Sequence, residues 1–118
     1  MDLLTPELRD RLLDNGRAQA PVRGTDGEID FPPVVKLFTP DGGCTWLLSE
    51  LDPDDPDIAF GLCDLGLGFP ELGSVSLTEL GEVRGALNLP VERDLFFVAK
   101  HGIGAYADEA AAAGFLRA

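Results

Sequence analysis

Residues 34–51 decide the fold, and they read VVKLFTPDGGCTWLLSEL. The two apolar runs, 34–38 and 44–51, are rich in β-branched and aromatic residues and predict two strands. Between them, residues 40–43 have the Pro-Asp-Gly-Gly composition of a turn. Because this connection is so short, we expect the two strands to form an antiparallel hairpin.

Two further strands are expected directly downstream. The large side chains of Ile58, Phe60 and Leu62 alternate with small ones over residues 58–64, which predicts a strand with two different faces. After a stretch broken by glycines and a proline, residues 72–76 predict a short fourth strand. The four strands together indicate an antiparallel meander.

Three helices are expected around this sheet. Residues 5–7, Thr-Pro-Glu, supply an N-cap, a proline for the first helical position and an acid in the first turn. This helix is predicted to end at residues 15–16, Asn-Gly, in a left-handed C-terminal cap. A capping box at 76–79 predicts a short second helix that ends near Gly85. The alanine-rich residues 106–113 predict the third helix.

One more strand is expected near the end of the chain. Residues 95–98, Leu-Phe-Phe-Val, have the composition of a buried strand, and Phe96 and Phe97 are expected in the core with Trp46. The fold class is therefore α+β, with a small antiparallel sheet of about four to five strands flanked by an N-terminal, a short middle and a C-terminal helix. With no repeat and no linker, residues 1–118 are expected to form a single acidic globular domain.

The acidic charge is concentrated in the middle of the chain. Nine basic and 21 acidic residues give a net charge of −12. Residues 26–82 hold thirteen of the acids and one base, Lys36. This balance argues against direct nucleic-acid binding and against anionic membranes, which both require an excess of Lys and Arg. It either serves only solubility or forms an acidic surface for a basic protein partner.

The sequence indicates a cytoplasmic protein. No apolar run approaches the ~20 residues of a membrane span. Residues 1–5 lack the basic and apolar regions of a signal peptide. The two cysteines, Cys44 and Cys63, are expected to be free thiols that pack as small apolar side chains.

An acidic loop is expected between the second and third strands. Its four carboxylates resemble a calcium loop in composition and belong to Asp52, Asp54, Asp55 and Asp57. Counted from Asp52, however, the EF-hand pattern requires glycine at position six and glutamate at position twelve, where this chain has Asp57 and Cys63. A solvated turn is therefore expected, with a weak divalent-cation site at 52–57 as the alternative.

Residues 61–73, GLCDLGLGFPELG, contain four glycines among apolar residues. They match neither a P-loop nor a dinucleotide-binding motif, because the required lysine and third glycine are missing. A bulged or tightly turned strand pair is the simplest interpretation. The alternative is a binding rim, in which Asp64 and Glu71 provide polar contacts and Leu67 and Phe69 provide exposed apolar ones.

Support for catalysis is thin, and an enzyme is expected less than a binding module. His101 is the only histidine, so a Cys–His dyad would have to use it with Cys44 or Cys63. No motif predicts a cofactor, a metal-ligand set or catalytic residues.

Three segments carry a resemblance to a known family. They are 3–8 (LLTPEL), 33–40 (PVVKLFTP) and, most specifically, 51–77. The chain resembles the bacterial family known as domain of unknown function 2958 over about residues 3–98. The resemblance implies an uncharacterised protein encoded on plasmids and other mobile elements, beside conjugation and antirestriction genes. It implies no activity and no catalytic residue.

The function expected first is a non-enzymatic interaction module whose acidic central surface meets a protein partner. Its strictest form is mimicry of DNA, which requires carboxylates at the density of duplex phosphates on one face. The alternatives are a small-ligand-binding or catalytic domain that uses residues 61–73, and the cation site at 52–57. The oligomeric state is left open by the sequence.

Overall fold

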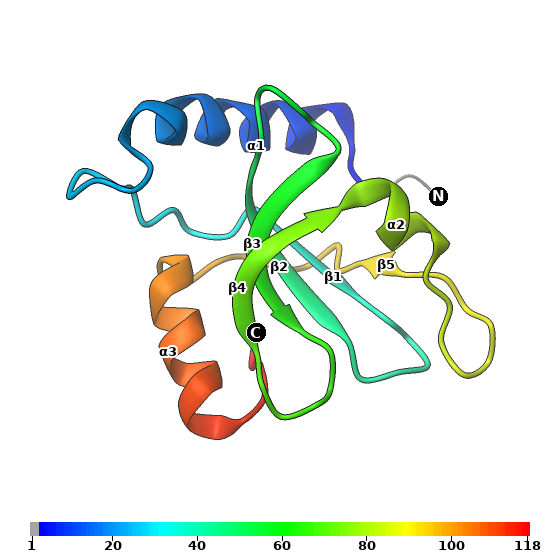
Figure 1. Cartoon of the computed structure of the whole chain (residues 1–118). Helices are drawn as coiled ribbons and strands as arrows, with labels where there is room; N and C mark the ends of the chain where they lie inside the picture. The colour runs from blue at the N-terminus through cyan, green and yellow to red at the C-terminus, as the bar shows by residue number, and fades with distance from the viewer. Residues whose placement is uncertain (1–2) are drawn as a thin grey trace.

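The computed structural model describes residues 3–118 and has a five-stranded antiparallel sheet at its centre (Figure 1). The elements in chain order are α1 (Pro6–Gln19), the short 3-10 helix η1 (Ala20–Val22), β1 (Val35–Phe38), β2 (Thr45–Leu51), β3 (Ile58–Asp64), β4 (Glu71–Ser76), α2 (Leu77–Glu82), β5 (Glu92–Arg93) and α3 (Ile103–Ala113). The strand order is β4-β3-β2-β1-β5. The α+β class, the four-strand meander and the three helices are therefore confirmed.

The sheet is covered by helices on both faces. Trp46 and Leu48 of β2 pack with Leu12 of α1 in one buried cluster. Leu47, which lies between them in the strand, packs with Tyr106 of α3 in a second cluster. Since successive strand residues point to opposite faces, α1 and α3 lie on opposite sides of the sheet.

Helix α1 begins as predicted but ends later. The Leu8 amide donates to the Thr5 hydroxyl at 3.2 Å, which is the predicted N-cap. The predicted end at residues 15–16 is wrong, because the helix continues to Gln19. Gly16 lies inside the helix and against β2, where a Cβ would come 1.8 Å from the carbonyl oxygen of Leu51. The glycine serves close packing and not termination of the helix.

A β-bulge changes the faces of β2. The register with β3 shifts between Leu48 and Glu50, so Ser49 is the extra residue. Leu48 and Leu51 consequently both point to the α1 face and join its core. Glu50 pairs with Phe60 and points to the α3 face.

The predicted strand at 95–98 is wrong. The last strand is only Glu92–Arg93, which pairs with β1 at the edge of the sheet. Asp94 then starts a turn by accepting a hydrogen bond from the Phe96 amide at 2.9 Å. The Phe96 side chain is 91% exposed and not part of the core. The chain leaves the sheet here because the Phe96 amide donates to the Asp94 carboxylate and is not available to pair with β1.

The two later helices differ slightly from their predicted bounds. The Ser76 N-cap of the predicted capping box is present, since the Glu79 amide donates to the Ser76 hydroxyl at 3.2 Å, and α2 ends at Glu82. Helix α3 begins at Ile103, three residues before its predicted start, and ends at Gly114 in a left-handed cap. No helix within residues 3–118 is long and apolar enough to cross a membrane.

Candidate functional site

The β3–β4 hairpin exposes a group of large apolar side chains. We call residues 65–72 the apolar hairpin, and its exposed members are Leu65, Leu67, Phe69 and Leu72. Leu67 is 73% exposed and Phe69 is 79% exposed. The loop turns through Gly66 and Gly68, whose φ angles of 78° and 87° favour glycine. The glycines therefore shape a tight loop that presents these side chains to solvent.

Two carboxylates, one directly before this hairpin and one within it, differ in their surroundings. Asp64 is buried and accepts hydrogen bonds from the amides of Gly66 at 2.8 Å and Leu116 at 2.9 Å. It fixes the start of the loop and ties the C-terminal segment to the sheet. Glu71 is exposed at the start of β4. Of this pair, Glu71 is the side chain free to meet a ligand from solution.

The acidic loop 52–57 is organised by its own backbone. The Asp52 carboxylate accepts from the Asp54 amide at 2.9 Å, and Asp55 accepts from the Asp57 amide at 3.4 Å. Among residues 3–118, no group of three or more His, Cys, Asp and Glu side chains is arranged to hold a metal ion. The structure therefore lends the alternative cation site no support.

Asp57 connects this loop to the start of α2. Its carboxylate accepts from the hydroxyls of Ser76 at 2.6 Å and Thr78 at 2.7 Å, and from the Thr78 amide at 2.9 Å. The hydrogen bond from the Ser76 hydroxyl lowers the pKa of Asp57 below its ordinary value of 3.8. The hydrogen bonds from the Thr78 hydroxyl and the Thr78 amide lower it further. Asp57 is a structural carboxylate at a helix start.

Other central carboxylates also serve the fold. Asp30 accepts from the Gly104 amide at 2.9 Å, and Asp41 accepts from the amides of Leu87 and Leu89. With Glu50, Asp52, Asp55, Asp57 and Asp64, seven of the thirteen central acids accept hydrogen bonds from other groups of the chain, but only Glu50 and Asp64 are buried.

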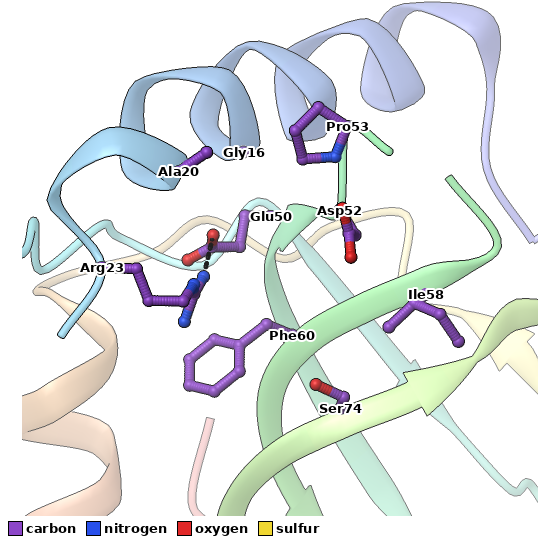
Figure 2. Close-up of a pocket in the computed structure, with 9 residues that line it drawn as sticks. All are labelled: Gly16, Ala20, Arg23, Glu50, Asp52, Pro53, Ile58, Phe60 and Ser74. Atoms are coloured by element: carbon purple, nitrogen blue, oxygen red, sulfur yellow. Dashed lines mark hydrogen bonds and ion pairs between the residues drawn. The ribbon is translucent and has the colours of Figure 1, made fainter. Parts of the chain in front are cut away.

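A cavity of about 330 Å³ lies between the end of α1 and the sheet (Figure 2). A row of side chains across three strands forms its floor: Glu50 on β2, Phe60 on β3 and Ser74 on β4. Arg23 and Asp52 also line it. The bulge in β2 creates this site, because it turns Glu50 to the same face as Phe60.

An ion pair and an aromatic ring dominate the cavity. The guanidinium of Arg23 lies 2.5 Å from Glu50 Oε2, and its Cζ is 5.2 Å from the centre of the Phe60 ring. Figure 2 shows the guanidinium between the two side chains. Gln19 donates to Glu50 Oε1 at 3.4 Å. The side chain of Glu50 is only 4% exposed, whereas that of Arg23 is 46% exposed.

Residues 3–117 match the family described as Protein of unknown function (DUF2958). The chain belongs to the DUF2958 family. The resemblance predicted from the sequence is thereby confirmed and extends nearly to the C-terminus. No curated protein and no solved structure matches this DUF2958 chain.

The sequence-predicted residues of this DUF2958 protein lie in two places. Asp64, Leu67, Phe69 and Glu71 come together at the apolar hairpin, and Asp52, Asp54, Asp55 and Asp57 lie in the loop at the other end of β3. The cavity residues Arg23, Glu50 and Phe60 were not predicted. One signal was present, since Glu50 is a charged residue in the otherwise uncharged strand TWLLSEL.

Proposed function

We propose that this DUF2958 protein is a non-enzymatic protein-binding module whose contact surface is the apolar hairpin. The observation that carries the proposal is the exposure of four large apolar side chains within eight residues. Clustered exposed apolar side chains are typical of interaction sites, whereas single ones are ordinary. Of the two carboxylates at the hairpin, Asp64 is buried and already accepts two backbone hydrogen bonds, and Glu71 is exposed at the edge of the apolar side chains.

The partner is expected to be a basic protein. The net charge of −12 attracts positively charged surfaces and repels acidic ones, including a second copy of this chain. DNA mimicry is the less favoured form of the proposal, because the contact surface proposed here is apolar and two of the thirteen central carboxylates, Glu50 and Asp64, are buried. The mobile-element association implied by the family resemblance makes conjugation and restriction proteins the first partners to examine.

The test compares two double substitutions, each of which replaces two exposed apolar side chains by serine. Leu67→Ser with Phe69→Ser removes the centre of the apolar hairpin, and Leu87→Ser with Leu89→Ser is the matched control in the loop before β5. Each protein is immobilised and exposed at low salt to lysate of the cells that encode it. Proteins released by a salt step are identified, purified and titrated against all three baits.

We expect a basic protein that binds the wild type and the control pair but is weakened at least about tenfold by the hairpin pair, or ~1.4 kcal/mol. Its affinity is expected to fall as salt increases, because salt screens exposed charges. Equal retention by the hairpin pair and the wild type would overturn the assignment of the surface. A purified partner that is acidic would overturn the charge argument.

A further inference from the structure

We propose that Glu50 and Phe60, at the wall of the cavity, form a guanidinium-binding site, which Arg23 occupies in the free protein and an arginine of the partner occupies in the complex. The source of that arginine rests on the proposed function, whereas the site itself rests on the cavity alone. No sequence motif marks it, because its residues come from α1, η1, three strands and the segments after η1 and β2.

The structure itself shows how a guanidinium is held there. Glu50 provides a carboxylate in contact with the guanidinium nitrogen, and Phe60 provides an aromatic ring near the cation. Both are groups that recognise arginine, through a charge-assisted hydrogen bond and a cation–π contact. Gln19 holds the second oxygen of Glu50 and therefore fixes the orientation of the carboxylate. The site is built before any partner arrives.

Arg23 is placed so that it can be exchanged. Its side chain is nearly half exposed, while Glu50 stays buried beneath it. Within the described chain, the hydrogen bonds of residues 24–28 all stay inside residues 22–28. The two ends of this loop are joined to each other by hydrogen bonds that do not involve Arg23, because Gln19 donates to the Ile29 carbonyl and accepts from the Ile29 amide. Arg23 can therefore swing out with the loss of only its own contacts.

The charge of the cavity favours a cationic occupant. Its charged lining consists of Arg23, Glu50 and Asp52. When Arg23 leaves, two carboxylates remain, one of them buried and in need of a counter-charge. The cavity of about 330 Å³ is open space beside Arg23, so an entering side chain has room to approach Glu50 and Phe60 before Arg23 leaves.

The test uses the full chain and needs no partner. The probe is N-acetyl-arginine amide, and N-acetyl-citrulline amide is its neutral control of nearly equal shape. Both are titrated into ¹⁵N-labelled wild type and Arg23→Ala, and amide shifts are followed by NMR. Arg23→Gln is titrated in parallel as a second variant in case Arg23→Ala does not fold, because the glutamine amide can still donate to Glu50.

We expect saturable shifts in Arg23→Ala at the Gln19 side-chain amide and at Ser74, with the arginine probe only. Binding to the wild type should be at least about tenfold weaker, because the tethered Arg23 competes at a high effective concentration. Phe60→Leu in the Arg23→Ala background should weaken the probe through loss of the ring. No saturable binding to either Arg23 variant, or equal binding of the citrulline probe, would overturn the site.

Two outcomes separate this inference from the proposed function. The hairpin pair Leu67→Ser with Phe69→Ser, combined with Arg23→Ala, should bind the arginine probe as Arg23→Ala does, because the hairpin is not part of the cavity. With a purified partner, the Nε–H signal of Arg23 should move on complex formation and thereby report its release. If that signal is unchanged in a complex that depends on the hairpin, the exchange is refuted and the protein-binding function stands.

Discussion

Substitution of Gly16 by alanine tests the packing of α1 on the sheet. In an exposed helix interior this change stabilises, because alanine has the higher helix propensity by ~1 kcal/mol. In this protein the added Cβ would lie 1.8 Å from the Leu51 carbonyl oxygen and 3.0 Å from its carbon. Both atoms belong to the backbone of β2 at its junction with the acidic loop. They cannot move aside as a flexible side chain could, so we expect the helix to be pushed away from the strand.

The expected sign is therefore the reverse of the helix-propensity effect. Overpacking in a well-packed interior costs about 1–3 kcal/mol, and a contact this close belongs in the upper part of that range. After subtraction of the propensity gain of ~1 kcal/mol, a net loss of about 1–2 kcal/mol in the free energy of unfolding remains. With a urea m-value of ~1–1.5 kcal/mol/M, the midpoint should fall by about 1 M.

The assay is urea unfolding followed by the fluorescence of Trp46, the only tryptophan, which is buried in the α1-facing core. The matched control is Gly81→Ala in α2, where an added Cβ would have no neighbour within 4 Å. The control should be neutral or stabilised by up to ~1 kcal/mol. A midpoint for Gly16→Ala at or above that of the wild type would refute the close packing of α1 on β2.

Three further predictions concern single side chains. Because hydrogen bonds from Ser76 and Thr78 lower the pKa of Asp57 in the folded state, its stabilisation is present above the ordinary value of 3.8 and is lost as pH falls through the lower folded pKa. Urea unfolding of Asp57→Asn at several pH values should therefore show a smaller loss of stability in acid than the wild type, and an unchanged pH slope would contradict this role. Burial raises the pKa of the Cys63 thiol above 9.0, so iodoacetamide at pH 8 should alkylate Cys63 in the folded protein much more slowly than in urea, as measured by peptide mass spectrometry. Equal rates would show that the thiol is not protected. Asp64→Ala leaves two backbone donors without their acceptor and should cost about 1–3 kcal/mol in urea unfolding, whereas an exposed control, Glu71→Ala, should change stability by less than ~0.5 kcal/mol.

Much of the fold follows from local signals in the sequence. The N-caps at Thr5 and Ser76 depend on groups three residues apart, and both are present. The turn at residues 40–43 and the alternation in 58–64 also act over short distances, and they define the meander. Such signals can be predicted because the interacting groups are neighbours in the chain.

Two wrong predictions have a common cause in contacts between distant residues. Gly16 has the composition of a helix end, but its role is set by Leu51, whose carbonyl oxygen would lie against an added Cβ. Residues 95–98 have the composition of a strand, yet the pairing of β5 with β1 ends at Arg93. In both cases an apolar or glycine pattern is compatible with two structures, and the tertiary partner selects one.

The sequence by itself determined the α+β class, the order of the main strands and helices, the family and the excess of negative charge. As the alternative interpretation of residues 61–73, it also predicted that Leu67 and Phe69 are exposed, and both are. Only the tertiary structure decided that the carboxylates of Glu50 and Asp64 are buried and that Glu50 meets Arg23 over Phe60. The reason is the bulge at Ser49, which turns Glu50 to the other face of the sheet. The bulge depends on pairing with β3, which begins seven residues after β2 ends.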